Sequence, residues 1–152
     1  MDEADVVIRW ASAPEDLRGA IALRRRVFCG EQGVAPSDEL DGLDDQADHL
    51  VALSPGVPPR VIATLRLLFD GERAKVGRVA VEPEWRRRGI ASRMLEQALV
   101  RARERGCREA RLASQLTATE LYERAGFTVQ SETFEEAGIP HVWMGRALPA
   151  RG

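Results

Sequence analysis

The sequence predicts a single α/β domain in which helices flank a mixed, mostly antiparallel central sheet. Three observations point to this fold class. Helix-like and strand-like segments alternate through the middle of the chain, a pair of strands joined by a turn lies on either side of that part, and 152 residues with 44% hydrophobic composition suffice for one continuous core. We therefore expect residues 1–152 to fold as one domain.

The first expected elements are a short strand and a helix. Residues 6–10 are rich in valine, isoleucine and tryptophan, which favour a strand. A helix is expected to begin at Ser12, because Ser12 and Glu15 have the spacing of a capping box and Pro14 lies in the first turn. Apolar residues spaced by three and four continue it to about Phe28, after which glycines and a proline interrupt the pattern.

The next segments predict a hairpin. After an acidic loop, residues 49–53 and 61–69 have strand patterns with a turn between them. The dipeptide at residues 70–71, Asp-Gly, is typical of hairpin turns. Residues 75–81 are therefore expected to pair with the second of these strands.

A helix, a strand and a short helix follow. Residues 92–105 place their apolar side chains on one helical face, and Gly106 is the expected C-cap. Residues 109–115 have a strand pattern. Thr117, with a glutamate three residues later, predicts a second capping box and a helix that stops at Gly126.

The last strands are expected over residues 127–134 and 141–148, with a turn at residues 136–140 between them. They complete the hairpin pair on the C-terminal side of the sheet. The open edges of such a sheet favour a homodimer.

Composition and charge exclude several functional classes. The formal net charge of −2 argues against a nucleic-acid-binding protein, which is normally basic. No apolar run approaches the roughly 18 residues that span a bilayer, and residues 1–5 are acidic where a signal peptide is basic, so we expect a cytoplasmic protein without membrane contact. Cys29 and Cys107 have no paired spacing, so we expect free thiols and no metal site.

Residues 79–91 combine the features of a phosphate-binding turn. They pass from a strand to a helix through three consecutive arginines and Gly89. A helix N-terminus offers free N–H groups and a positive dipole end, glycine allows close approach of the backbone, and arginines add charge-assisted hydrogen bonds. The alternative is a solvated arginine-rich turn, whereas the glycine pattern of a dinucleotide-binding fold is missing.

Arg86, Gly89 and Ala91 resemble the pyrophosphate motif of the GNAT superfamily of acyl-CoA-dependent N-acyltransferases, in which arginine or glutamine is followed by two residues, glycine, one residue, and glycine or alanine. The resemblance implies that acetyl-CoA is the co-substrate. It also implies that the strand before the turn pairs with the pantetheine arm, and that amides of residues 86–92 bind the diphosphate. The residues implied to bind this co-substrate are Val79, Ala80, Val81, Arg86, Arg87, Arg88, Gly89, Ile90, Ala91, Ser92 and Gln115.

Residues 121–127 resemble a second GNAT motif, in which a tyrosine on a short helix precedes the Gly-Phe that starts the next strand. Tyr122 is the only tyrosine of the chain. The resemblance implies that its hydroxyl hydrogen-bonds or protonates the departing thiolate of CoA. The alternative is an amphipathic tyrosine that packs under the sheet.

The resemblance leaves the general base open. Attack on a thioester requires a neutral amine, so a base or a chain of waters must take a proton from an ammonium substrate. Many GNAT relatives place a glutamate on the strand before the phosphate turn, but residues 75–81 contain no carboxylate. The remaining candidates are Glu31, His49 and His141.

Residues 26–49 and 134–144 resemble the ElaA-like branch of GNAT proteins, so the resemblance spans nearly the whole chain. This branch implies a fold and a cofactor but no acceptor. The first stretch contains acidic residues that form either a solvated loop or a rim that pairs with a cationic acceptor. These residues are Asp38, Glu39, Asp41, Asp44, Asp45 and Asp48. A calcium loop on the EF-hand register is a third interpretation, but it lacks the acidic first position and the bidentate glutamate.

Two other functions stay open. An acyl-homoserine-lactone synthase would share the fold, an Arg-Val-Phe segment and a Glu-x-Asp-x-x-Asp pattern, but this chain is shorter than is usual there. A non-catalytic CoA-binding module is the second, and Tyr122 argues against it. We expect direct transfer of an acetyl group from acetyl-CoA to an amine of a small molecule or peptide, with Tyr122, His141 and Glu31 as candidate catalytic residues.

Overall fold

The chain folds around a mixed sheet of eight strands. The computed structural model describes residues 2–149. Seven strands follow the order β1-β2-β3-β4-β5-β8-β6, and β7 pairs with β8. β4 and β5 are parallel and the other pairs are antiparallel, which confirms the predicted fold class. The strands are β1 Val7–Trp10, β2 Asp48–Leu53, β3 Val61–Asp70, β4 Arg73–Val81, β5 Glu109–Gln115, β6 Thr128–Val129, β7 Phe134–Glu136 and β8 Ile139–Ala147.

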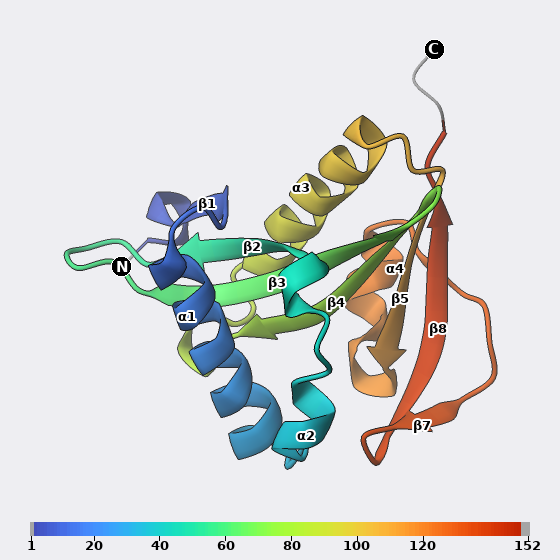
Figure 1. The fold of residues 1–152 in the computed structure, drawn as a ribbon, viewed down its shortest axis with the longest axis horizontal. Helices are drawn as coiled ribbons and strands as arrows, with labels where there is room; N and C mark the ends of the chain where they lie inside the picture. Colours follow the sequence, from blue (N-terminus) through green and yellow to red (C-terminus); the bar gives the residue numbers. More distant parts are fainter. Residues whose placement is uncertain (1, 150–152) are drawn as a thin grey trace.

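Helices cover both faces of this sheet. In the view of Figure 1, α1 and α2 lie in front of the sheet, and α3 and α4 lie behind it. Leu23 of α1 packs with Val51 on the front face, and Leu95 of α3 packs with Leu67 on the back face, so each layer buries its own cluster. The helices are α1 Pro14–Arg24, α2 Pro36–Glu39, α3 Ile90–Glu104 and α4 Thr119–Arg124, with a π-helical segment Arg25–Glu31 after α1.

α3 follows the predicted amphipathic pattern and begins two residues earlier than predicted, at Ile90. Gly106 lies just beyond the helix with φ +80°, the left-handed conformation in which glycine ends helices without strain. Five predicted core positions of the helix are buried, namely Met94, Leu95, Ala98, Leu99 and Ala102. The back layer of the molecule could therefore be predicted from its periodicity.

Neither predicted capping box forms. At α1 the side-chain acceptor is Asp16, whose Oδ2 accepts the amide of Ser12 at 3.2 Å and whose Oδ1 pairs with Arg9 at 3.0 Å. At α4 the N-cap is Ala118, so Thr117 lies one residue too early to cap the helix. In both cases the capping spacing is present but the helix begins elsewhere, because tertiary contacts also decide where a helix starts.

The predicted strand over residues 127–134 is interrupted. β6 and β7 pair with different parts of β8, and the chain between them leaves the sheet. There the Oγ of Ser131 accepts the amide of Trp143 at 2.9 Å. A side chain thus takes the acceptor position that a strand carbonyl would otherwise fill.

β3 and β4 form the predicted hairpin, and β4 contains an irregularity. Thr64 pairs with Ala80, and Arg66 pairs with Gly77, so β4 has one extra residue between these pairs. This is a β-bulge, which bends a strand and re-aims its side chains. Arg78 lies in the bulge with φ +52°, an uncommon conformation for a residue other than glycine.

β4 and β5 separate after a short parallel contact. Their pairing covers Arg73–Val76 with Glu109–Leu112. Beyond it, β4 runs toward the start of α3, whereas β5 continues beside β8, and Figure 1 shows the two arrows diverging. This divergence positions the site described below.

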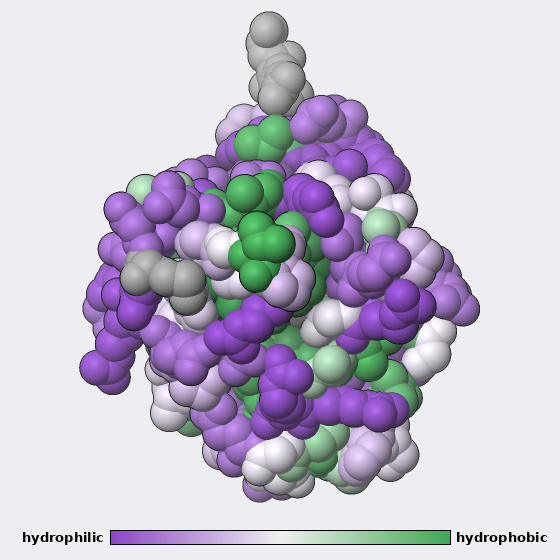
Figure 2. Space-filling model, turned by 90° about the vertical axis from the view of Figure 1, so that its left-hand side faces the viewer, coloured by the Kyte–Doolittle hydropathy of each residue, from purple (hydrophilic) through white to green (hydrophobic). Residues whose placement is uncertain are grey.

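The end of the molecule that carries β1 is mostly hydrophilic, with a small hydrophobic group in its middle, as Figure 2 shows. The loop between β2 and β3 projects from this end in Figure 1, and its Val57 is 98% exposed. A small apolar group of this kind is ordinary on a protein surface. None of the helices within residues 2–149 is long and apolar enough to cross a membrane.

Candidate active site

A cavity of about 430 Å³ opens where β4 and β5 separate. Val79 of β4, Ala113 of β5 and Tyr122 of α4 line it from the sheet and the back layer. Glu39 of α2 and His141 of β8 line it as well. The cavity therefore brings together segments from the first third, the middle and the end of the chain.

The N-terminus of α3 offers an anion site without a side-chain cap. Gly89 is the N-cap with φ +78°, and no side chain accepts from the first turn. The first helical hydrogen bond runs from the amide of Arg93 to the carbonyl of Gly89 at 3.1 Å, so the N–H groups of residues 90–92 have no acceptor in the helix. The amide of Arg86 donates to the carbonyl of Pro83 at 3.3 Å, which corrects the expectation that the run of free amides begins at that residue.

The three arginines of the turn have different partners. Both terminal nitrogens of Arg86 donate to Glu31 at 2.8 Å, and its Nε donates to the carbonyl of Val81 at 2.9 Å. The guanidinium of Arg88 lies over the ring of a buried tryptophan. Arg87 is exposed, and it has no hydrogen bond or ion pair with any residue from 2 to 149. Arg86 therefore fixes the turn, while Arg87 has its charge available to a ligand.

Of the three β4 residues predicted to bind pantetheine, only Val79 lines the cavity. Ala80 is buried in the cluster beneath α1. The backbone carbonyl of Val81 accepts a hydrogen bond from Arg86. Ile90, at the start of α3, is also fully buried. Ala80 and Ile90 can therefore contribute to binding only through their backbone groups.

Tyr122 is buried at the wall of the cavity. Its ring meets that of Phe127 edge to face, with 6.3 Å between the ring centroids. Burial raises the pKa of Tyr122 to about 12, because a medium of low polarity disfavours the phenolate. The hydroxyl is therefore protonated at neutral pH and can donate a hydrogen bond to a group in the cavity.

His141 is also buried at the cavity wall, and its tautomer is fixed. Its Nδ1 lies 2.6 Å from the carbonyl oxygen of Ile139, and because a carbonyl only accepts, Nδ1 carries the proton. Nε2 is then the basic nitrogen of the neutral ring, and it lies 3.7 Å from Oε2 of Glu136. A ring held in one tautomer, with a carboxylate near its other nitrogen, has a geometry that a general base can use.

The two other candidate bases are engaged elsewhere. A hydrogen bond from Arg86 lowers the pKa of Glu31, which makes this carboxylate a weaker base, and Glu31 does not line the cavity. His49 has its Nε2 2.9 Å from the carbonyl oxygen of Asp44 and borders a different cavity of about 330 Å³ beside α1. The structure thus places Glu31 outside the cavity and against Arg86 of the turn, and its catalytic role stays a prediction that the geometry does not favour.

Three arginines and three carboxylates form an ion-pair network along one side of the cavity. They are Arg24, Arg66, Arg78, Glu39, Asp41 and Asp44. Arg24 and Glu39 are 2.9 Å apart, and each side chain is 1% exposed. Arg78, on the bulge of β4, reaches the same carboxylate at 2.8 Å. The network thus ties α1, α2 and two strands together.

The network corrects the expectation for the acidic stretch, which is neither a solvated loop nor a rim of free carboxylates at these positions. Hydrogen bonds from Arg66 hold the pKa of Asp41 far below its usual range. Burial opposes ionisation of Asp44, but hydrogen bonds and charge from Arg24 and Arg66 outweigh it, and its pKa is lowered too. The charges of these six groups cancel, so the unpaired negative charge on this side of the cavity is that of Asp38, which lines the cavity and has no ion pair within residues 2–149.

Gln115 connects the two sides of the cavity. Its Nε2 donates to Oε1 of Gln32 at 2.8 Å, and both residues line the cavity. The contact joins the end of β5 to the segment after the π-helical turn. We predicted that the co-substrate bonds to Gln115. Such a ligand would either share the side-chain amide of Gln115 with Gln32 or break the hydrogen bond between the two residues.

The sequence interpretation missed the arginines that face the acidic stretch. Arg66 is a charged residue in the middle of a mostly apolar strand, and Arg24 stands among apolar residues on a helix face. Buried arginines are rare unless they are paired. An arginine at a core position was therefore the available signal, and the acidic stretch was its natural partner.

The comparisons with known proteins agree with this geometry. Residues 57–148 match the family described as an acetyltransferase (GNAT) domain. The chain belongs to the GNAT acetyltransferase family. A proposed acetyltransferase of Bacillus subtilis is 32% identical over 141 residues, which cover 90% of this chain and 93% of the relative.

Solved GNAT structures have the same fold. A proposed N-acetyltransferase from Lactobacillus plantarum is 31% identical, with a TM-score of 0.85 over 95% of this chain and 99% of the other. Escherichia coli ElaA is 24% identical, with a TM-score of 0.79 over 92% of this chain and 99% of the other. As a GNAT protein, the chain is an acyltransferase of a family whose co-substrate is acetyl-CoA.

Proposed function

We propose that this GNAT protein transfers an acetyl group from acetyl-CoA directly to an amine. The observation that carries the proposal is the single cavity at the divergence of β4 and β5, which is lined by Tyr122 and by His141 in a fixed tautomer. The strand of β4 leads from this cavity to the uncapped N-terminus of α3. An extended co-substrate with a diphosphate at one end and a thioester at the other fits this course.

His141 acts first in the proposed mechanism. Its Nε2 takes a proton from the acceptor nitrogen, and the neutral amine attacks the thioester carbonyl. A backbone N–H of β4 near Val79 stabilises the oxyanion of the tetrahedral intermediate. The nitrogen of the intermediate then gives its second proton to solvent, and the C–S bond breaks, which gives the N-acetyl product and the CoA thiolate.

Tyr122 stabilises the departing sulfur by hydrogen bonding. With a pKa of about 12, the phenol is a weaker acid than a thiol, whose usual pKa is about 8.5. Full proton transfer to the thiolate is therefore uphill by roughly 4 to 5 kcal/mol. A donated hydrogen bond needs no such transfer, and the proton that completes the thiol comes from His141 or from solvent.

Thermal unfolding with acetyl-CoA tests the cofactor half of the proposal. A ligand that binds only the folded state, at 100 times its dissociation constant, adds about 2.7 kcal/mol to the free energy of unfolding. The midpoint should rise with acetyl-CoA and stay unchanged with NADH. A panel of amines with thiol detection then tests turnover. A folded sample without any shift would contradict acetyl-CoA binding, and a shift without thiol release from any amine would indicate a binding module.

A further inference from the structure

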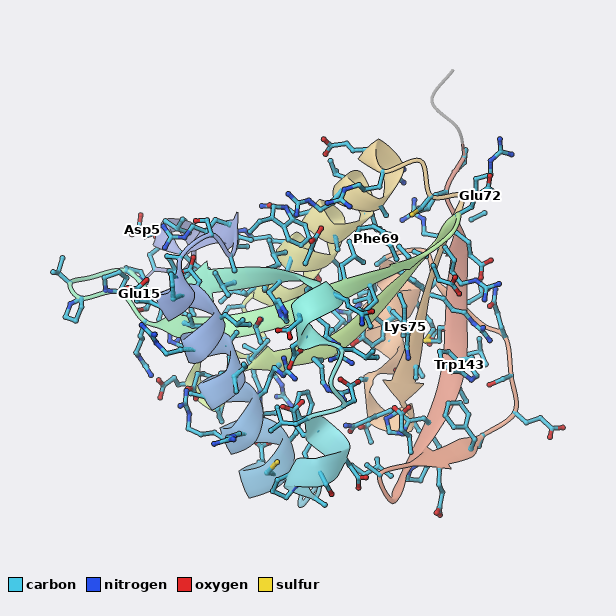
Figure 3. The ribbon with its side chains drawn as sticks, in the orientation of Figure 1. Asp5, Glu15, Phe69, Glu72, Lys75 and Trp143 are labelled. Atoms are coloured by element: carbon cyan, nitrogen blue, oxygen red, sulfur yellow. The ribbon has the colours of Figure 1, made fainter. Side chains whose placement is uncertain are left out.

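Lys75 is the only lysine among the 22 basic residues of the chain. It lies on β4 and lines the cavity. Its side chain is exposed, and Nζ lies 5.2 Å from the ring centroid of Trp143 on β8, with both residues labelled in Figure 3. The ring holds the ammonium group by a cation–π contact at the edge of the cavity.

A second cation lies directly opposite the first. Arg111 of β5 is the cross-strand partner of Lys75, and its guanidinium lies 4.3 Å from the centroid of the same tryptophan ring. Neither cation forms an ion pair with a carboxylate among residues 2–149, and the Nε of Arg111 is buried without a hydrogen-bond partner. Like charges that face each other across a sheet are destabilising. A bound anion would remove that cost.

A row of aromatic rings connects these cations to the proposed base. Trp143 stacks on Phe134 with 5.6 Å between the centroids, and Phe134 stacks on His141 with 6.1 Å. His141 and Trp143 are two residues apart on β8, so their side chains lie on the same face of the sheet. The cation pair and the Nε2 of His141 therefore lie at the two ends of one short row.

The remaining charges of the cavity suit an acceptor with two opposite charges. The ion-pair network is neutral, since its three arginines balance its three carboxylates. Lys75 offers a positive charge at one end of the aromatic row, and Glu136 offers a negative charge beside His141 at the other. An ammonium group near Glu136 and an anionic group near Lys75 would complement both.

We propose that the acceptor is an amine that also carries an anionic group, a carboxylate or a phosphate, and that Lys75 and Arg111 bind this group. The inference rests on the proposed acetyl transfer. The ammonium group lies at His141, loses one proton to Nε2, forms the new C–N bond to the acetyl carbonyl carbon, and gives a second proton to solvent. CoA leaves as the thiol, and the anionic group is unchanged by the reaction.

Matched acceptors test this assignment. Steady-state rates are measured with phenylalanine and phenethylamine, and with phosphoethanolamine and ethanolamine, so that each pair differs by its anionic group. The wild-type enzyme should favour the anionic member of at least one pair by roughly tenfold or more in kcat/KM, as expected for a hydrogen bond to a charged group. A preference in the first pair would indicate that the site binds a carboxylate, and a preference in the second pair would indicate a phosphate.

Lys75→Met keeps the apolar stem on the tryptophan ring and removes the charge. It should raise KM for the preferred acceptor with an anionic group by roughly tenfold, leave kcat within a few-fold, and leave the matched amine without an anionic group unaffected. Lys75→Arg should restore most of the affinity. Arg108→Met is the matched control, because Arg108 is an exposed cation outside the cavity that pairs only loosely with Glu72, at 3.7 Å.

The outcomes separate this inference from the proposed function. Turnover of the amines without an anionic group at equal or better kcat/KM would overturn the anionic acceptor and leave acetyl transfer in place. Equal losses for both members of a pair in Lys75→Met would show that the lysine has only a structural role, which also overturns it. Failure of every amine despite acetyl-CoA binding would overturn the proposed function and this inference with it.

Discussion

Tyr122 and His141 reach the cavity from different elements and are held there in different ways. Burial and the edge of Phe127 fix the phenol of Tyr122, whereas a hydrogen bond to the carbonyl of Ile139 fixes the imidazole of His141. The first group keeps its proton at neutral pH, and the neutral imidazole of the second carries its lone pair on Nε2. Their proposed roles, hydrogen-bond donor to sulfur and acceptor of the amine proton, follow from this difference.

Tyr122→Phe should lower kcat about tenfold and leave the affinity for acetyl-CoA within about twofold, because it removes one hydrogen bond made to the developing thiolate. Steady-state kinetics and calorimetry measure the two effects. With a pKa of about 12, the hydroxyl keeps its proton up to about pH 10, so deprotonation of Tyr122 should not reduce wild-type activity below that pH. Equal kcat for the variant and the wild type would leave Tyr122 with a packing role only.

His141→Gln and Glu31→Gln distinguish the proposed base from the candidate that lies outside the cavity. His141→Gln should lower kcat roughly 100-fold at pH 7, and the loss should shrink toward pH 10, where a simple amine needs no base. Glu31→Gln should leave kcat within about threefold, because its carboxylate is bound by Arg86. A pH series of initial rates measures both variants. A larger loss of kcat in Glu31→Gln than in His141→Gln would indicate that Glu31 is the base.

At the scale of elements, the sequence predicts regular structure well and its irregularities poorly. α3 and the hairpin of β3 and β4 could be predicted, because periodicity and turn residues act locally. The bulge at Arg78 could not, because Arg78 is held in a left-handed conformation by contacts with Glu39, far away in the sequence. The gap between β6 and β7 depends likewise on a hydroxyl of Ser131 that bonds to another strand.

The uncapped start of α3 gives a prediction at this scale. Gly89 has φ +78° and open space where a Cβ would lie, so a side chain there costs about 1 kcal/mol in backbone strain but meets no clash. Gly89→Gln and Gly89→Glu carry side chains of nearly the same size, and only the second adds a negative charge. Calorimetry should show weaker acetyl-CoA binding for Gln and none for Glu. Equal affinities for the two variants would mean that the diphosphate binds elsewhere.

At the scale of the whole molecule, buried charge joins the front helices to the sheet. The acidic stretch could be seen in the sequence, but its partners Arg24, Arg66 and Arg78 are scattered over three elements, and only the fold shows that they meet. The position of the cavity is a similar case. Its cofactor half follows from two local motifs, whereas its acceptor half is assembled from segments that no local pattern links.

Arg24→Met should destabilise the fold by about 3 to 5 kcal/mol, because it leaves the carboxylate of Glu39, and that of Asp44 in part, without a buried counter-charge. Arg25→Met, at the exposed neighbouring position, should change the free energy of unfolding by less than about 0.5 kcal/mol. Urea unfolding at pH 7 measures both variants. Similar stabilities for the two would show that the network contributes little to the fold.

The same network sets the response to acid. The folded-state pKa values of Asp41 and Asp44 lie below the ordinary value of 3.8, so these groups contribute stability that is complete well above pH 3.8 and is lost as the pH falls below it. Because Arg24 is one cause of the lowered pKa of Asp44, its loss should move acid unfolding to higher pH. Circular dichroism along a pH titration of Arg24→Met and Arg25→Met measures this difference.

The scarcity of lysine limits how acetyl thioesters, the co-substrates of this family, can modify the protein without catalysis. Acetyl thioesters slowly modify lysine amines without any catalyst, whereas guanidinium groups keep their proton and do not react. A chain whose basic side chains are arginines at every position but one has a single lysine target, Lys75, and that lysine lines the cavity itself. Modification of lysine is thereby confined to one position, which a ligand bound in the cavity would shield.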